Sequence, residues 1–191
     1  MRVGIGLILA LLVLTGCVYK NTPLTFSPYV PKPSTMVGGK SVQKVYLKTV
    51  IDNRPRQSIV ASSTNTSGQN VGYATTSTAV DVWVHDALRR GLLARGYEVV
   101  VQPFKEAKTL EVSIDELFAH YNGTLLSGDN LTGTMQLSLH VKSGQTTTTK
   151  RVSQSQQQWH APMHSSVAFK PFLERLMKDV LARAIDEIHA L

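Results

Sequence analysis

Residues 131–141, LTGTMQLSLHV, alternate apolar and polar side chains along almost their whole length. A period of two is typical of a strand that buries one face and exposes the other. Residues 110–115, LEVSID, follow the same rule, and turn-forming residues fill the chain between the two stretches. The two stretches therefore predict two strands of a half-buried sheet.

Further strands are predicted on either side of these two. Residues 45–51 alternate apolar and polar side chains, and residues 97–101 form another short apolar run. The tripeptide Ser143-Gly144-Gln145 predicts a tight hairpin into residues 146–159. Because residues 146–159 are polar on both faces, we expect an edge strand there, or a strand that projects past the core.

Two helices are predicted from apolar residues at helical spacing. The first runs from a Thr78-x-x-Asp81 start signal to Gly96, a residue type that commonly follows a helix. The second runs from about Phe169 to Ala190, with Pro171 in its first turn. The order β-α-β-β-β-β-α predicts an α+β fold, a two-layer sandwich in which two helices cover one face of a mostly antiparallel sheet.

Two other stretches lack the pattern of a helix or a strand. Residues 18–40 contain four of the eight prolines, which fix φ and lack a backbone donor, so we expect an extended tether with no regular element. Residues 52–77 are rich in serine, threonine and glycine, and there we expect a long loop that is functional or mobile.

The first residues, MRVGIGLILALLVLTGC (1–17), have the layout of an export signal. Arg2 supplies the positive start, and an apolar run of about 12 residues is too short to cross a bilayer as a helix. Leu14-Thr15-Gly16-Cys17 resembles the lipobox of bacterial lipoproteins, which implies lipid attachment to Cys17 and cleavage before it. The alternative is an ordinary secretory signal that happens to carry a cysteine.

The predicted organisation is a signal peptide (1–16), a lipidated Cys17 with a proline-rich tether (17–40), and a single α+β domain (41–191). Cys17 is the only cysteine of the chain, so no intramolecular disulfide can form. Val18 follows it. By resemblance to the sorting rule of Gram-negative lipoproteins, a residue other than aspartate there implies the outer membrane, with the domain facing the periplasm.

The charge of the chain points to an anionic partner. There are 20 lysines and arginines against 13 acidic residues, a net charge of +7. Such an excess favours lipid headgroups, a phosphorylated glycolipid or an acidic glycan. The basic residues are scattered and form no run with interleaved aromatic side chains, so no nucleic-acid partner is predicted. The alternative is a mildly basic surface with no specific partner.

Three features together resemble a known family. They are the lipobox, the segment Ile51-Asp52-Asn53-Arg54-Pro55 at the end of a predicted strand, and the segment LLARGYEV (92–99), which joins a helix to a strand. They resemble the YajG-type small lipoproteins and, more distantly, the auxiliary lipoproteins of envelope transport and assembly systems. The resemblance covers most of residues 41–190. It implies the fold and the membrane address, with no activity to carry over.

The sequence shows no constellation of catalytic or metal-binding residues. His160 and His164 are separated by Pro162, and no cysteine is available to join them in a metal site. Asp115 and Glu116 are adjacent, so we expect them on opposite faces of a strand, unsuited to paired acid–base work. No catalytic residue, metal ligand or cofactor is therefore predicted.

Arg54 and Arg56, at the start of the 52–77 loop, are the residues predicted to contact a partner. Their guanidinium groups suit an anionic ligand or another envelope protein. The alternative is structural, with Asp52 paired to Arg54 at the end of a strand.

The predicted function is that of a non-catalytic, lipid-anchored outer-membrane protein that binds or scaffolds an envelope component. Two alternatives stay open: a subunit of a larger envelope transport or assembly complex, and an enzyme that acts on envelope glycans or lipids through an unrecognised site. A deep pocket with converging polar groups would favour the enzyme. An exposed edge strand at residues 146–159 would favour the binding protein.

Overall fold

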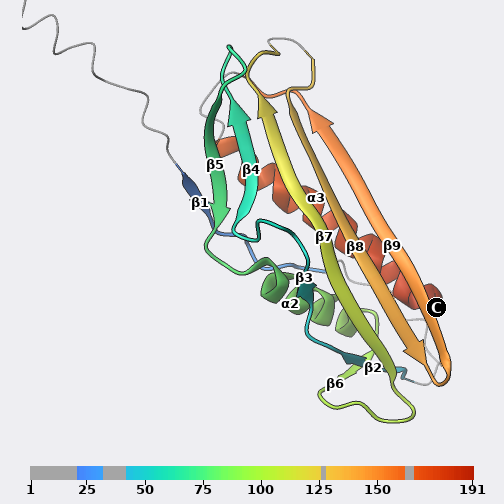
Figure 1. Ribbon diagram of the computed structural model, residues 1–191. Helices are drawn as coiled ribbons and strands as arrows, with labels where there is room; N and C mark the ends of the chain where they lie inside the picture. The colour runs from blue at the N-terminus through green and yellow to red at the C-terminus, as the bar shows by residue number, and fades with distance from the viewer. Residues whose placement is uncertain (1–20, 32–41, 126–127, 162–165) are drawn as a thin grey trace, which may run out of the picture.

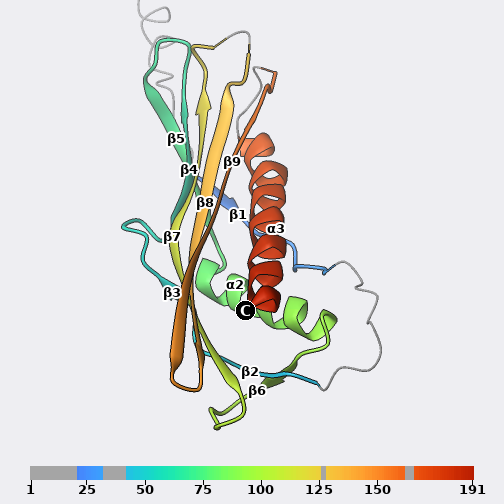
Figure 2. The ribbon, with the colours of Figure 1, turned by 90° about the vertical axis from the view of Figure 1, so that its right-hand side faces the viewer.

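The computed structural model describes residues 21–31, 42–125, 128–161 and 166–191. These residues form one nine-stranded sheet and two helices, and both helices lie on the same face of the sheet (Figures 1 and 2). The predicted α+β sandwich is confirmed. The helices are α2 (Val80–Ala94) and α3 (Ser166–Ala190). The strands are β1 (Thr22–Leu24), β2 (Lys44–Leu47), β3 (Ile51–Asp52), β4 (Ile59–Thr64), β5 (Asn70–Thr76), β6 (Glu98–Val100), β7 (Lys108–Asn122), β8 (Leu131–Ser143) and β9 (Thr146–Gln158).

β7 is the long central strand of the sheet. On one side it pairs antiparallel with β8, which pairs antiparallel with β9. On its other side β2, β3 and β4 follow one another, all parallel to it. β5 pairs antiparallel with β4, and β1 and β6 add short parallel pairs at the margins. The long ladders are antiparallel as predicted, and the short parallel ones make the sheet mixed.

The apolar row of β8 holds α3 against the sheet. Met135, Leu137 and Leu139 are fully buried, as their alternation predicts. Gly133 lies in the same row, and a Cβ there would stand 2.6 Å from the ring of Phe172 in α3. The missing side chain therefore lets the helix lie close to the strand.

The two helices meet at another glycine. A Cβ at Gly91 in α2 would clash with the side chain of Ile185 in α3. Leu88 and Leu92 lie beside this contact in α2 and are fully buried. Among the described residues, no helix combines the length and the hydropathy that crossing a membrane requires.

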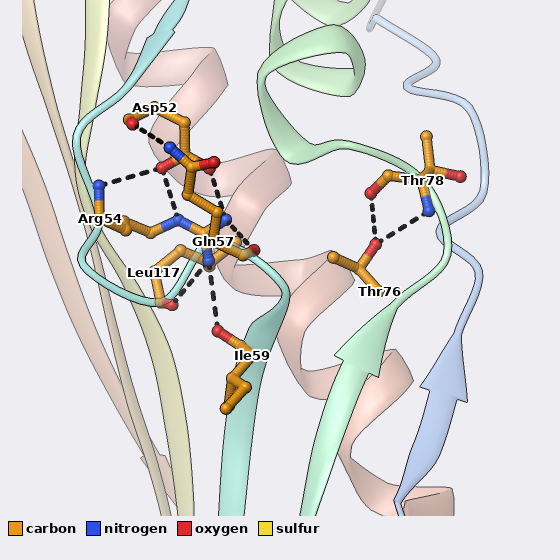
Figure 3. Close-up of polar contacts among 7 residues, drawn as sticks. All are labelled: Asp52, Arg54, Gln57, Ile59, Thr76, Thr78 and Leu117. Atoms are coloured by element: carbon orange, nitrogen blue, oxygen red, sulfur yellow. Dashed lines mark hydrogen bonds and ion pairs between the residues drawn. The ribbon is translucent and has the colours of Figure 1, made fainter.

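The predicted N-cap of α2 is wrong, whereas the glycine predicted to follow the helix is confirmed. No side chain caps its start, where Ala79 precedes the first helical residue, so the predicted cap by Thr78 is wrong. The hydroxyl of Thr76 instead donates to the Thr78 carbonyl at 2.5 Å and accepts from the Thr78 N–H at 3.2 Å (Figure 3). At the other end Gly96 has a φ of 82°, as expected for a glycine that follows a helix.

The predicted 52–77 loop is wrong, because most of it is the β4–β5 hairpin. Val60, Ala61 and Ala74 in these strands are buried in the core. Only residues 65–69 form the turn between them, with Gly68 at a φ of 77°. The small Ser and Thr side chains gave no apolar alternation, and the hairpin is held by pairing with β7 and β1.

The expectation of no regular element in residues 18–40 is also wrong, because Thr22–Leu24 forms β1. Beyond β1, Phe26 is buried and its ring meets that of Trp83 edge to face, with centroids 6.3 Å apart. The indole N–H of Trp83 donates to the Ser27 carbonyl at 2.9 Å. Residues 22–31 therefore belong to the folded body, and residues 32–40 lie outside the described ranges.

Candidate functional site

Arg54 lies at the centre of a buried polar cluster between β3 and β4 (Figure 3). Its side chain is 4% exposed. It donates to both carboxylate oxygens of Asp52, from Nε at 2.9 Å and from Nη2 at 2.7 Å. Nη2 also donates to the Gln57 carbonyl at 2.7 Å, and Nη1 donates to the carbonyls of Leu117 and Ile59 at 3.4 and 3.5 Å. All five N–H donors of the guanidinium group are used inside the chain.

This cluster fills a gap in the hydrogen-bond ladder of β7. β3 pairs with β7 as far as Ile114, and β4 pairs with it from Ala119 onwards. Leu117 lies in the gap, and its carbonyl accepts from Arg54 instead of from a neighbouring strand. For Arg54, the structural alternative of a pair with Asp52 is the arrangement that the structure shows.

A small open pocket of about 200 Å³ lies next to this cluster. Pro55, Arg56 and Ile59 line one side of it, and Glu116 and Phe118 of β7 line the other. Arg56 and Glu116 are exposed, so both charges are available to a partner. Ligand clefts usually measure roughly 300–1,000 Å³, so this pocket suits one side chain of a partner better than a glycan or a lipid.

Asp115 and Glu116 line the same pocket, so the expectation that they lie on opposite faces is wrong. The pairing of β7 with β8 shifts between Ile114 and Glu116, and this bulge interrupts the strict alternation of side chains. Asp115 accepts from Ser138 at 2.6 Å and from Ser113 at 3.0 Å. Burial alone would raise the pKa of Asp115, but these hydrogen bonds outweigh it and lower the pKa. Asp115 is therefore an ionised carboxylate fixed by hydrogen bonds, and it is not suited to donate a proton.

Ser62 and His120 share a hydrogen bond on the sheet face opposite the helices, with Oγ and Nδ1 2.9 Å apart. They are register partners on β4 and β7. Burial lowers the pKa of His120, so its ring is neutral at pH 7. Among the described residues no carboxylate is hydrogen-bonded to His120, and no three His, Cys, Asp or Glu side chains gather closely enough to bind a metal ion.

β9 forms a long exposed edge of the sheet, as predicted for residues 146–159. It pairs with β8 from Thr146 to Gln158 without a bulge, and with no other strand in the described part of the chain. One row of its backbone N–H and C=O groups therefore faces away from the sheet.

The side chains of β9 that face the helices form hydrogen bonds with α3. Gln154 and Gln156 both donate to Asp179, at 3.4 and 2.7 Å. Lys150 and Arg151 are the only charged residues of the strand, and the half from Val152 to Gln158 contains no charge and no proline. Natural sheets usually protect an edge with charged residues, prolines or bulges, and this half has none of them.

Other residues singled out in the sequence lie away from these features or outside the described ranges. Cys17 and His164 belong to the residues that the structure does not describe. The chain after β9 is held by Asn130, which is buried. Its amide donates to the His160 carbonyl and its Oδ1 accepts from the His160 N–H, both at 2.8 Å. His160 therefore takes part in a structural contact through its backbone.

A family model described as uncharacterised lipoprotein matches residues 31–188. The chain belongs to this lipoprotein family. The resemblance to small lipoproteins found in the sequence is thereby confirmed at the level of the family, and the family's description brings no activity with it. The comparison with curated proteins finds no match.

Two solved structures share the fold of this lipoprotein. One is the crystal structure of a protein from Xanthomonas campestris, with a TM-score of 0.59 and 13% sequence identity over 86% of this chain and 92% of that chain. The other is the crystal structure of an uncharacterised protein, with a TM-score of 0.57 and 11% identity over 88% and 99% of the two chains. At these identities the likeness concerns the fold alone.

Proposed function

We propose that this lipoprotein is anchored in the outer membrane and binds another protein of the cell envelope without catalysing a reaction. The signal peptide (1–16) directs export, lipid on Cys17 holds the chain at the membrane, and the folded domain lies in the periplasm. Membership of the lipoprotein family and the leader sequence support the anchor. Val18, which follows the lipidated cysteine, supports the outer membrane.

The observation that carries the binding role is the unprotected edge of β9. An extended segment of a partner can add to such an edge as a further strand, with main-chain hydrogen bonds supplying affinity. The regular pairing of β9 with β8 keeps its free donors and acceptors in line over the whole strand. Arg151, which is exposed, favours a partner segment with an acidic side chain opposite the first half of β9, whereas Lys150 faces α3 and pairs with Glu187 at 3.6 Å.

The pocket next to Arg54 supports a protein partner rather than a glycan or a lipid. Its volume of about 200 Å³ accommodates one side chain, and its rim offers both a cation at Arg56 and an anion at Glu116. A mixed rim of this kind matches the polar margin of a protein interface. Arg56 is therefore the member of the predicted arginine pair that is available to a partner.

The binding role is tested by photo-crosslinking in intact cells. A photoreactive amino acid is placed at Ser153 or Ser155, which are exposed on β9, and in a matched control at Arg183, which is exposed on α3. The proposal predicts one discrete adduct with an envelope protein from the two β9 positions and none from Arg183. Equal labelling at all three positions, or none at Ser153 and Ser155, would contradict it.

A second variant tests whether the edge itself is the contact. Replacing Ser153 and Ser155 by lysine puts charges on the unprotected half of β9 while both positions stay exposed. With the photoreactive group moved to Gln157, the double-lysine protein is expected to lose at least nine-tenths of the adduct. Retention of the adduct would show that the partner contacts another surface.

An enzyme acting on envelope glycans or lipids is the second candidate function, and the Ser62–His120 hydrogen bond is the contact that favours it. A serine activated by a neutral histidine can act as a nucleophile. Replacing Ser62 by alanine would then abolish hydrolysis of acyl esters on lipids or glycans and leave the crosslink at β9 unchanged. The binding role predicts that this variant behaves as the wild type in both assays.

A further inference from the structure

One end of the sheet carries three connecting segments, here called the loop end. They are the β4–β5 turn (65–69), the described residues between β7 and β8 (123–125 and 128–130), and residues 159–161 after β9. Figures 1 and 2 both show these segments at the same end of the molecule. The opposite end carries β2, β6 and the β8–β9 turn (Figure 1).

The chain enters the fold near the loop end. β1 pairs Thr22 with Ala74, which pairs with Ala61, which in turn pairs with Ala119 of β7. Thr22 is therefore level with Ala119, three residues before the end of β7 at Asn122. β1 runs parallel to β5, away from the loop end, so Thr22 is the residue of β1 nearest to that end.

The short connection to Cys17 limits where the bilayer can lie. Five peptide units separate Cys17 from Thr22, and they span at most roughly 18 Å when fully extended. From Ala119 to Asn122 is about 10 Å at strand spacing, so Cys17 can reach about 8 Å beyond the end of β7, to the level of the loop end. From Ala119 to Lys108, at the far end of β7, is about 36 Å, which is beyond its reach.

The loop end also has the side chains that a bilayer surface favours. Trp159 is 52% exposed and Leu125 is 42% exposed. Tryptophan is enriched at membrane–water interfaces, where its apolar ring and its N–H meet both environments. The three segments contain no lysine or arginine and a single acidic residue, Asp129, although the whole chain carries a net charge of +7. The contact therefore depends on insertion rather than on attraction to anionic lipid.

We propose that the loop end rests on the membrane surface, with Trp159 and Leu125 in the interfacial layer of the bilayer. This orientation rests on the lipid anchor at Cys17 of the proposed function. In this orientation β9 runs away from the membrane surface, and its uncharged half, Val152 to Gln158, lies nearest the lipid.

Quenching of tryptophan fluorescence tests this orientation directly, because the chain has two tryptophans in different places. Trp83 is buried in the core and hydrogen-bonded to Ser27, whereas Trp159 is exposed at the loop end. The full lipidated protein is reconstituted in phosphatidylcholine vesicles with brominated acyl chains. The emission of Trp159 is expected to fall at least two-fold, and the variant Trp159→Phe is expected to show no quenching.

A matched control places a tryptophan at the opposite end. Val101 is 91% exposed in the chain after β6, so Val101→Trp in the Trp159→Phe background adds an exposed indole there. This variant is expected to stay unquenched. Quenching of the indole introduced by Val101→Trp, together with an unquenched Trp159 in the wild-type protein, would overturn the orientation.

Flotation separates a failed orientation from a failed anchor. The wild-type lipidated protein is expected to float with the vesicles, and Cys17→Ser is expected to remain in solution. If the wild-type protein floats but Trp159 is not quenched, the orientation is overturned and the anchor stands. If the mature wild-type protein carries no lipid and does not float, the anchor itself fails and the orientation fails with it.

Discussion

Arg54 occupies the position where β7 lacks a neighbouring strand, and its guanidinium group joins the turn of residues 53–58 to the central strand. The sequence allows two roles for Arg54 in the Asp52-Asn53-Arg54-Pro55 segment, contact with a partner or pairing with Asp52. It could not decide between them, because the gap in the ladder depends on where β3 and β4 pair with β7.

Removing Arg54 is expected to destabilise the protein strongly. Arg54→Ala removes the guanidinium donors from the Asp52 carboxylate and from the carbonyls of Gln57, Ile59 and Leu117, a change at a buried site that costs about 3–5 kcal/mol. Arg56→Ala, at an exposed position two residues away, is expected to stay within about 0.5 kcal/mol of wild type. Urea unfolding of the non-lipidated domain measures both. Equal stability of the two variants would contradict the structural role of Arg54.

His120 is expected to make the fold sensitive to mild acid. Burial lowers its pKa in the folded state below the usual 6.5, so the unfolded chain binds the proton more readily. Stability is therefore full above pH 6.5 and is lost as the pH falls through the lower pKa of the folded state. Urea unfolding between pH 7.5 and 5 is expected to show a smaller loss for His120→Gln than for wild type. Identical pH profiles would contradict this account.

The Asp115 region shows what the residue pattern could not reveal. Alternation along residues 110–115 predicted the strand, and the strand is there. No feature of the sequence marks the bulge after Ile114, because it follows from the pairing of β7 with β8. The shared pocket of Asp115 and Glu116 was therefore missed.

At the scale of elements, β8 and α3 were predicted because each carries a strong apolar period of its own. The β4–β5 hairpin was missed for the opposite reason. Its serines and threonines are compatible with a loop, and only pairing with β7 and β1 makes strands of them. β9 was predicted as an edge because an edge strand needs no apolar period.

The contact between β8 and α3 gives a test at this scale. Gly133→Val is expected to displace Phe172 and to cost about 1–3 kcal/mol through overpacking. Combining it with Phe172→Leu is expected to restore part of that loss, since the smaller side chain makes room. Thermal unfolding of both variants measures the effect. A Gly133→Val protein as stable as wild type would show that α3 does not pack closely there.

The whole molecule differs from the sequence prediction in how the domain is attached. The sequence placed residues 17–40 in a tether, whereas the structure packs residues 22–31 against α2, α3 and β5. The prolines in this segment led to the prediction of a tether. The segment in fact contains a strand of three residues and two buried aromatic side chains, Phe26 and Tyr29. The folded domain therefore begins close in sequence to Cys17, the residue predicted to carry lipid.

Deleting residues 21–31 is expected to weaken the whole fold. The loss of Phe26 and Tyr29 from the core removes about 1.5–3 kcal/mol for each buried aromatic side chain. A control protein lacking only residues 18–20 keeps β1 and both aromatics. Urea unfolding is expected to show a clearly lower midpoint for the deletion than for the control. Equal midpoints would mean that this segment is a tether after all.

The proposed function requires that β9 binds a partner strand along its free edge. Amide hydrogen exchange along β9 tests it most directly, in the purified protein and in the complex captured by the crosslink at Ser153. Alternate amides between Thr146 and Gln158 are expected to exchange at least ten-fold more slowly in the complex, while amides of α3 keep their rates. Unchanged exchange along β9 in a complex that is otherwise intact would contradict binding along this edge.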